Sequence, residues 1–252
     1  MSRAVVTGGL GFLGFELCLA ILEEGLEVVA ADIDQKAGER WLEVGRNANI
    51  TYQPLHQALP TEFSGARIYI NLYDCFSRSK GKQQLEDIRD FVENNKSYLE
   101  SAVVLMPSVL SNRIEDDELT GFIEFLEEQF SRYYSVYIPT LFGPRQPDSF
   151  LFQQVITGAA SGTGFVDDTR SAIFVKDAAN SIINIEENSA ENIQLVSDTP
   201  DSWIKSLKIL GRTDADIPDD RPVREMVPSG AKKIAVKPSS SLKEVLGLQR
   251  NC

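Results

Sequence analysis

Cysteine and histidine are scarce in this chain of 252 residues. The three cysteines, Cys18, Cys75 and Cys252, lie far apart in the sequence, which excludes a zinc knuckle and a CxxC redox pair. The single histidine, His56, follows the third expected strand, away from the edge where a ligand would bind, so a histidine-activated nucleophile is not expected. These absences favour a reduced, cytoplasmic compartment and predict no metal site.

Positive charge and long apolar runs are scarce as well. The chain has 25 Lys and Arg against 37 Asp and Glu, which gives a formal net charge of −12. Because neutralising a phosphate backbone needs a basic face, a nucleic-acid partner is excluded. No apolar run approaches the roughly 18 residues that cross a bilayer, so no membrane partner is expected. Apolar residues make up 42% of the chain, which is ordinary for a single large globular unit.

Short β-branched runs alternate with helical patterns through the first 140 residues. The expected strands cover residues 4–6, 27–31, 49–52, 67–72, 102–106 and 134–138, and the expected helices cover residues 12–24, 35–44, 82–98 and 116–130. This alternation predicts an α/β fold with a Rossmann-type doubly wound parallel sheet. We assign residues 1–140 to this domain and residues 141–252 to a small substrate cap with returning elements, closed by a helix that ends near Gly247.

A glycine-rich loop, TGGLGFLG at residues 7–14, directly follows the first expected strand and opens a helix. Gly8 permits the tight turn, Gly11 lets the backbone approach a pyrophosphate, and Gly14 lets the helix pack closely on the strand. Free N–H groups and the positive end of the helix dipole then face the phosphates. The residues expected to bind a dinucleotide here are Thr7, Gly8, Gly11, Phe12, Leu13 and Gly14.

Asp32 ends the second expected strand, eighteen residues after Gly14. A carboxylate at this place accepts hydrogen bonds from both ribose hydroxyls of an adenosine and repels a 2′-phosphate. Asp32 and the adjacent Ile33 therefore complete the expected cofactor site. The sequence predicts NAD(H) as the cofactor, in preference to NADP(H).

Three further segments occur in the order found in one family. IPTLFGPRQ at residues 138–146 resembles the family's RP-x-x-x-YGPRQ, RSAIFVKDAA at residues 170–179 resembles RDFVHVDDVA, and KPSSSLKEVLGL at residues 237–248 resembles the closing helix. With the glycine loop and Asp32, they make the chain resemble the extended short-chain dehydrogenase/reductase family of NAD-dependent epimerases and dehydratases. The resemblance implies a small-molecule ligand of nucleotide-sugar type. It also implies a homodimer, paired through the helices expected at residues 82–98 and 116–130.

The chain departs from this family at the catalytic pair. Family members use a tyrosine whose phenol pKa is lowered by a lysine one helical turn later. None of the seven tyrosines has a lysine four residues on: Tyr52, Tyr69, Tyr73, Tyr98, Tyr133, Tyr134 and Tyr137. The usual redox chemistry is therefore not expected.

Two alignments of the helix that should carry this pair remain open. Counting from Ser108, which matches the family's Ser or Thr, places Thr120 and Glu124 at the two positions. Counting back from the later Phe-Gly-Pro places Asp116 and Thr120 there instead. Neither alignment supplies a phenol or an ammonium group.

Arginines are the residues expected to bind a substrate. Arg170 matches the family's first pyrophosphate-binding arginine, Arg224 is a candidate for the second, and Arg145 in GPRQ is a third. The alternative for each is a surface ion pair in an acidic protein. Asp177 matches a family carboxylate, with a role at the start of a helix as the alternative.

The segment after the fourth expected strand reads NLYDCF, where the family has small residues beside the nicotinamide. Tyr73, Asp74 or Cys75 could exchange a proton from this new direction, with Ser108, Tyr73 and Asp74 as the catalytic candidates. The alternative is that these side chains fill space that cofactor or substrate would otherwise occupy. The sequence thus leaves three hypotheses: an NAD(H)-binding sensor or scaffold partner without redox chemistry, an atypical oxidoreductase or epimerase, and a scaffold with a relic site.

Overall fold

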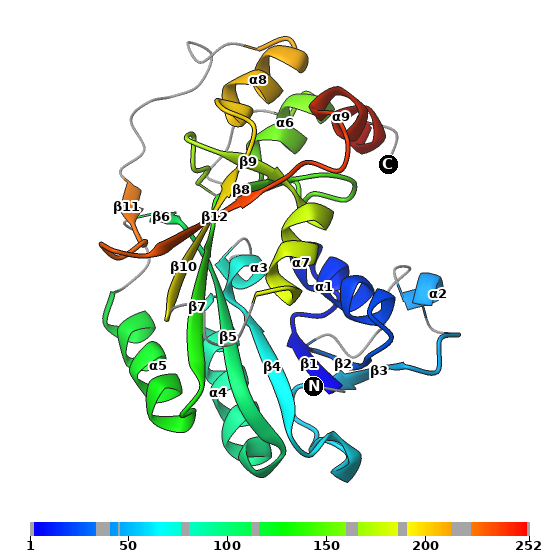
Figure 1. Ribbon diagram of the computed structural model, residues 1–252, viewed down its shortest axis with the longest axis vertical. Coiled ribbons are helices and arrows are strands. Elements are labelled where there is room, and N and C mark those ends of the chain that lie inside the picture. Colours follow the sequence, from blue (N-terminus) through cyan, green and yellow to red (C-terminus); the bar gives the residue numbers. More distant parts are fainter. Residues whose placement is uncertain are drawn as a thin grey trace.

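A parallel sheet of eight strands forms the centre of the molecule in the computed structural model, which describes residues 3–33, 41–44, 46–76, 81–111, 116–159, 166–185, 191–212 and 223–250 (Figure 1). The strands are β1 (Arg3–Thr7), β2 (Glu27–Asp32), β3 (Ile50–Pro54), β4 (Ala66–Asn71), β5 (Leu99–Pro107), β7 (Tyr133–Ile138), β10 (Asn192–Ser197) and β12 (Lys232–Val236). Their order is β12-β10-β7-β5-β4-β1-β2-β3, and every neighbouring pair is parallel.

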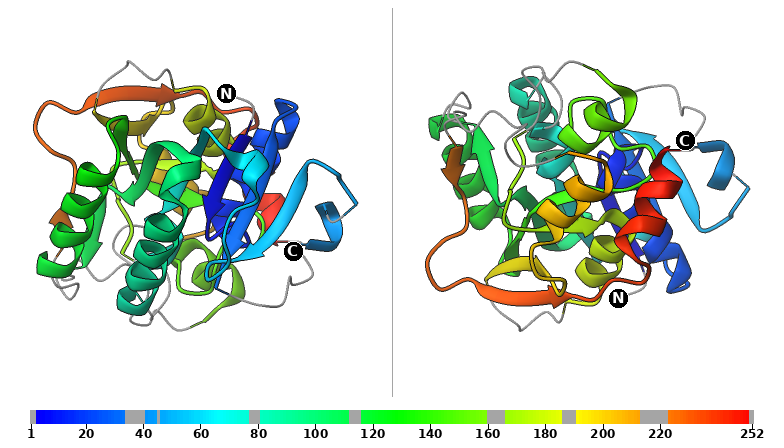
Figure 2. Two further views of the ribbon diagram at one scale, coloured as in Figure 1. Left: turned by 90° about the horizontal axis from the view of Figure 1, so that it is seen from below. Right: turned by 90° about the horizontal axis from the view of Figure 1, so that it is seen from above.

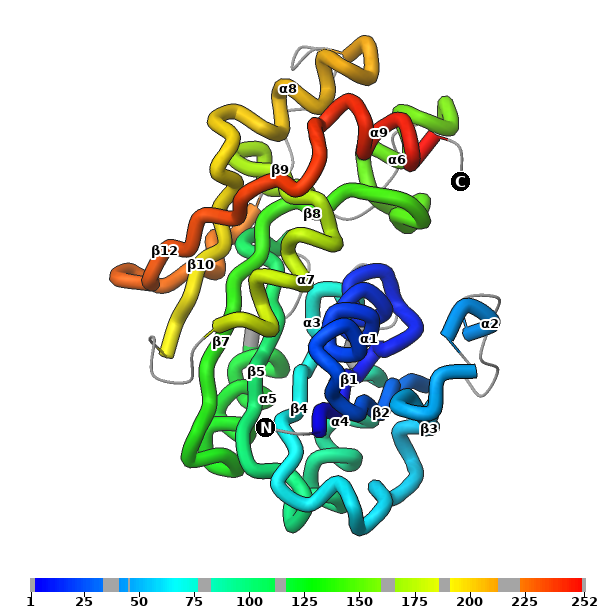
Figure 3. The backbone as a smooth tube through the Cα atoms, turned by 45° about the vertical axis from the view of Figure 1, so that its right-hand side comes forward, coloured from blue at the N-terminus to red at the C-terminus, as the bar shows by residue number. Residues whose placement is uncertain are grey.

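Helices cover both faces of the sheet (Figure 2). On one face, α1 (Phe12–Glu23) lies beside α7 (Val175–Ile183), and on the other lie α4 (Gly81–Asn95) and α5 (Asp116–Gln129) (Figure 3). Successive strand residues point to opposite faces, so Ala4 and Val6 of β1 enter the core under α1 while Val5 enters the core under α4 and α5. A strand buried on both sides reads as a continuous apolar run, as Ala4-Val5-Val6 does.

A smaller layer lies above the carboxyl ends of the strands (Figure 1). It contains the parallel pair β8 (Thr140–Phe142) and β9 (Ala172–Phe174), and the helices α6 (Leu151–Thr157), α8 (Ser202–Ile209) and α9 (Leu242–Arg250). Phe142, Phe152 and Trp203 are central to its own apolar core. The remaining elements are the antiparallel pair β6 (Val109–Ser111) and β11 (Val223–Glu225), the short helices α2 (Trp41–Val44) and α3 (Leu72–Phe76), and 3₁₀ turns at Thr61–Phe63 and Lys96–Tyr98.

The Rossmann-type fold expected from the sequence is confirmed, and all six expected strands are present. Residues 35–40 of the expected second helix lie outside the described residues. The division at residue 140 stays a prediction, and β10 and β12 beyond it join the main sheet.

The expected end of the closing helix near Gly247 is wrong, because α9 continues to Arg250. The buried side chain of Gln249 explains the extra turn. Its Oε1 accepts a hydrogen bond from the Gly143 N–H at 3.0 Å, and its Nε2 donates to Gln146 at 2.7 Å. Among the described residues, no helix is long and apolar enough to cross a membrane.

Candidate functional site

The glycine loop lies at the carboxyl end of β1 and leads into α1. Gly8 has a φ of +63°, and its carbonyl accepts a hydrogen bond from the Gly11 N–H at 2.8 Å. A Cβ at Gly14 would lie 2.0 Å from the Gly8 oxygen, so α1 packs against the turn as closely as a backbone permits. Glycine is therefore required at both places, as the sequence predicts.

Asp32 lies beside this loop, at the end of β2. Its Oδ2 accepts a hydrogen bond from the Leu10 N–H at 3.1 Å, and its Oδ1 accepts one from the Ile33 N–H at 2.8 Å. The carboxylate is buried and borders a cavity shared with Gly8 and Ile33. The structure thus brings together the loop and the acidic residue that the sequence assigns to one cofactor site.

The side chain of Asp74 lies against the N–H groups of the glycine loop. Its Oδ2 accepts hydrogen bonds from the backbone N–H groups of Leu13 and Gly14, both at 3.0 Å, and from the Asn71 side chain at 2.7 Å. A Cβ at Gly11 would lie 2.3 Å from the same oxygen. The carboxylate of Asp74 therefore occupies the space that Gly11 keeps open, at the N-terminus of α1, where anions bind.

Asn71 explains how Asp74 reaches this position. The Asn71 side chain caps α3, because its Oδ1 accepts a hydrogen bond from the Asp74 N–H at 3.2 Å. The Asn71 N–H donates to the Thr7 hydroxyl at 3.0 Å, which fixes α3 against the end of β1. An Asn followed three residues later by Asp has the spacing of a capping box, which is the sequence signal for this arrangement. Asn71 thus caps α3 and also donates to the Asp74 carboxylate, which accepts from the N-terminal N–H groups of α1.

The cavity beside the loop is small. It has a volume of about 20 Å³, and its polar lining includes Asp32, Asn71, Asp74 and Gln84. A water molecule needs at least about 10–15 Å³, so the space suits one or two waters. The Gln84 Oε1 is buried and accepts no hydrogen bond among the described residues. Sequence reasoning missed Gln84, whose position in the first turns of an amphipathic helix carries no distinctive signal.

Tyr73, a catalytic candidate from the sequence, is fully buried. Its hydroxyl donates to the Pro139 carbonyl at 3.1 Å and accepts from the Leu141 N–H at 2.8 Å. Burial raises the pKa of the phenol, and the charges of Asp167, Asp74 and Asp168 raise it further. Tyr73 is therefore a neutral phenol bonded to the backbone, whereas the family's chemistry uses a phenol whose pKa is lowered.

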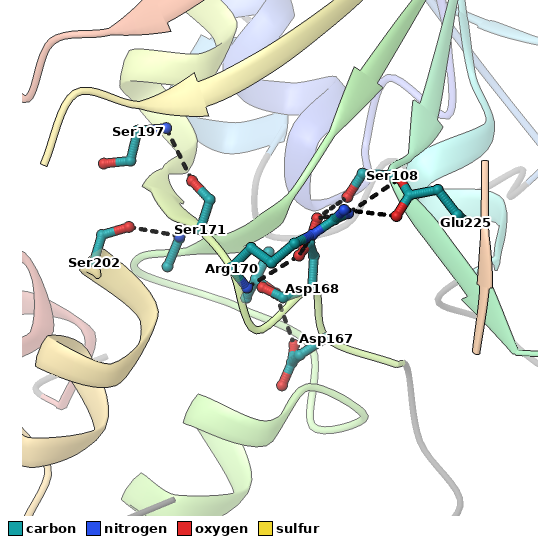
Figure 4. Close-up of polar contacts among 10 residues, drawn as sticks. Ser108, Asp167, Asp168, Arg170, Ser171, Ser197, Ser202 and Glu225 are labelled. Atoms are coloured by element: carbon teal, nitrogen blue, oxygen red, sulfur yellow. Dashed lines mark hydrogen bonds and ion pairs between the residues drawn. The ribbon is translucent and has the colours of Figure 1, made fainter. Parts of the chain in front are cut away.

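Ser108, another candidate, belongs to a network with two carboxylates and an arginine (Figure 4). Its buried hydroxyl donates to Asp168 Oδ2 at 2.5 Å. Arg170 binds both oxygens of Asp168, each at 2.8 Å, and pairs with Glu225 of β11 at 2.6 Å. These contacts raise the pKa of the Arg170 guanidinium, mainly through the hydrogen bonds that it donates to Asp168. Sequence reasoning missed Asp168 and Glu225, since an Asp two residues before an Arg is common in loops.

The other substrate-binding candidates have different partners, each on a separate part of the chain. Arg145 has a φ of +64° and forms an ion pair with Glu43 of α2. Arg224 donates from Nε to Met226 Sδ at 3.3 Å. Asp177 accepts a hydrogen bond from the Ser239 N–H at 3.1 Å, so it ties the first turn of α7 to the loop after β12.

On α5, Thr120 and Glu124 are exposed, and both are positions to which the sequence alignments assign the missing catalytic pair. His56 is exposed as well. Within the described residues, no group of three or more His, Cys, Asp or Glu side chains could hold a metal ion.

Solved structures share this architecture across almost the whole chain. UDP-glucuronic acid 4-epimerase from Bacillus cereus, in complex with UDP-glucuronic acid and NAD, is 14% identical with a TM-score of 0.62, covering 99% of this chain and 98% of that one. TunA, an NAD-dependent NDP-hexosamine 5,6-dehydratase, is 12% identical with a TM-score of 0.61, covering 99% and 96%. WbmH from Bordetella bronchiseptica, in complex with NAD+, is 16% identical with a TM-score of 0.55, covering 98% and 97%.

No protein-family model and no curated protein sequence matches the chain. At identities of 12–16%, the likeness is one of fold. The chain has the fold of the extended short-chain NAD-dependent epimerases and dehydratases, as the sequence motifs predict.

Proposed function

We propose that this chain, built on the epimerase/dehydratase fold, binds NAD(H) at the carboxyl edge of its sheet and does not perform tyrosine–lysine redox chemistry. The observation that carries the proposal is the pairing of the glycine loop with Asp32. The loop lies at the N-terminus of α1, and Asp32 lies beside it at the end of the neighbouring strand. The solved structures of the same fold are described as NAD complexes.

The donors at the loop fit the cofactor. The N–H groups of Leu13 and Gly14 already hold a carboxylate, so they suit an oxyanion such as a pyrophosphate. Asp32 suits the ribose hydroxyls, and the Gln84 oxygen suits an amino group. Binding requires Asp74 to leave the loop and the cavity of about 20 Å³ to widen. NAD would supply a hydride acceptor, and these residues would hold it.

The side chains near the site do not supply the family's acid/base pair. Tyr73 is a neutral phenol whose hydroxyl is hydrogen-bonded to two backbone groups, and the Ser108 hydroxyl donates to Asp168. Loss of a positioned acid or base lowers a rate by about 10²- to 10⁴-fold. A role in sensing the cofactor, or as a scaffold partner, therefore fits the site better than the conversion of a sugar.

A nucleotide-sugar-like ligand remains part of the proposal. UDP-glucuronic acid is bound in one of the structures with this fold. Arg170, Arg224 and Arg145 are the proposed contacts, and Arg170 is half-exposed on the network of Figure 4. A diphosphate would have to replace Asp168 or Glu225 as the partner of Arg170, so we expect weak binding.

The second candidate is a scaffold whose cofactor site is permanently closed. The specific observation in its favour is the Asp74 carboxylate on the N–H groups of the loop. The two candidates differ in one property, which is the ability of the native chain to bind a dinucleotide.

Calorimetric titration with NAD and NADP tests the proposed function. We expect the native chain to prefer NAD, because Asp32 repels a 2′-phosphate. Asp32→Ala should weaken NAD binding by about 10- to 100-fold, the loss of two or so charge-assisted hydrogen bonds at about 1.4 kcal/mol per factor of ten, and should remove the preference. Glu128→Ala, which removes an exposed carboxylate of α5, is the control and should change neither. Equal, undetectable binding of both dinucleotides by the native chain would leave only the scaffold.

The proposal also includes a homodimer through α4 and α5. The apolar stripes of these helices face their own sheet, and the outward positions carry carboxylates, including Glu86, Asp90 and Glu124. Two copies packed through these faces bring like charges together, so the dimer should strengthen as salt screens the repulsion. Sedimentation velocity at low and high ionic strength measures this. A monomer under both conditions contradicts the dimer.

A further inference from the structure

The N-terminus of α1 is satisfied by a carboxylate from another part of the chain. We infer that Asp74 is a built-in occupant of the anion subsite of the glycine loop, and that this autoinhibitory contact must be displaced before a pyrophosphate can bind. The inference rests on the proposed binding of NAD(H). It names a residue that controls access to the site.

The contacts of Asp74 define the occupied position. One oxygen lies 3.0 Å from each of the Leu13 and Gly14 nitrogens and 2.7 Å from Asn71 Nδ2. The other oxygen lies 3.2 Å from the Leu13 nitrogen. A pyrophosphate needs these same N–H groups, and it carries the same sign of charge as the carboxylate. The two anions therefore cannot share the subsite.

A second observation is a buried hydrogen-bond acceptor in the same cavity that has no donor among the described residues. Gln84 is 7% exposed and lines the same cavity, and its Oε1 accepts no hydrogen bond among the described residues. Buried acceptors normally have a donor, which is a water or a ligand where the protein offers none. The Gln84 Oε1 lines the same cavity as Asp32 and Asp74. An acceptor without a donor there indicates that the cavity opens to hold a molecule with hydrogen-bond donors.

The turn that carries Asp74 is also connected to the cap. Tyr73, its neighbour on α3, bonds to Pro139 and Leu141, where the chain leaves β7 for β8. A movement of α3 that withdraws Asp74 from the loop strains or breaks these bonds. Displacement of Asp74 is thus linked to the segment that leads into the substrate cap.

The first test asks whether an emptied subsite binds an anion. In Asp74→Ala, the N–H groups of Leu13 and Gly14 lose their acceptor, so inorganic phosphate should raise the thermal midpoint of this variant. The native chain should gain less at matched ionic strength. Asp177→Ala is the matched control. Like Asp74, Asp177 is a buried carboxylate that accepts a hydrogen bond from the backbone, but its one donor, the Ser239 N–H, lies away from the glycine loop. An equal response of all three proteins to phosphate overturns the inference.

The second test measures NAD binding to the native chain, Asp74→Ala and Asp74→Asn by calorimetry. We expect both variants to bind NAD about 5- to 150-fold more tightly, which is the usual range for the coupling between two sites on one protein. Asp74→Asn retains an acceptor for the loop, so it tests the charge in a folded chain even if the alanine variant unfolds. The calorimetric comparison thus isolates the carboxylate from the shape of the side chain.

The outcomes separate the inference from the proposed function. Native and variant proteins that bind NAD equally well contradict the role of Asp74 and leave the proposed function standing. Binding by the variants alone supports the role of Asp74 and removes NAD binding from the native chain. No binding by any of the three contradicts both.

Discussion

Replacing Gly14 by alanine is expected to destabilise the protein by about 3–5 kcal/mol, which is above the usual range of about 0.5–3 kcal/mol for a single substitution. The added Cβ would lie 2.0 Å from the Gly8 oxygen and 2.8 Å from the Gly8 carbonyl carbon. Both are backbone atoms of a loop held by the Gly9 N–H bond to Ala31 and the Gly11 N–H bond to Gly8, so neither can move freely. The thermal midpoint should fall by about 10 °C or more.

A second glycine in a helix provides the control. Gly121 lies inside α5, and apart from the backbone of its own helix no atom of the described residues lies within 4 Å of a Cβ placed there. Gly121→Ala should leave the midpoint unchanged or raise the stability by up to about 1 kcal/mol, because alanine has the higher helix propensity. Thermal denaturation followed by circular dichroism compares the two. A Gly14→Ala variant that melts with the native protein would show that the loop can relax.

Replacing Asp168 by alanine is expected to cost about 2–3 kcal/mol of stability. Asp168 is 4% exposed and accepts hydrogen bonds from Ser108 and from Arg170. Its removal leaves the buried Ser108 hydroxyl without its acceptor. Arg170 is half-exposed and stays partly hydrated, which keeps the loss below the 3–5 kcal/mol of a fully buried pair. Urea denaturation measures the change.

The same arginine offers a matched control. Glu225 pairs with Arg170 at the surface, where both side chains are about half-exposed. Glu225→Gln should therefore change the stability by less than about 1 kcal/mol. Equal losses of stability from Asp168→Ala and Glu225→Gln would contradict this prediction, because they would mean that the buried carboxylate contributes no more than the exposed one.

A fold shared with enzymes does not by itself imply their chemistry, and this chain illustrates the physical reason. The glycine loop has the tight turn that the sequence predicts, whereas the side chains around it bond to one another. Asp74 occupies the loop, and Asp168 holds both Ser108 and Arg170. A ligand that uses the N–H groups of the loop or the Arg170 guanidinium would have to compete with these contacts.

Much of the site could be predicted from the sequence because its signals are local. The glycine loop needs a strand before it and a helix after it, and both are visible as patterns within residues 3–23. Asp32 follows from the end of the next strand. Tyr73, Asp74 and Cys75 could be singled out as a departure from the family, with two uses left open. In the structure, Tyr73 is buried and bonds to the backbone at Pro139 and Leu141, and Asp74 accepts hydrogen bonds from the N–H groups of the glycine loop.

The sequence by itself determined the alternation of strands and helices, the glycine turn and the absence of a Tyr-x-x-x-Lys pair, because each is a matter of neighbouring residues. Only the tertiary structure decided which side chains meet. Asp74 lies sixty-one residues from Leu13, and Asp168 lies sixty residues from Ser108. Those contacts depend on how α3 and the loop before β9 pack over the ends of the strands, and packing direction is not written in any short pattern of residues.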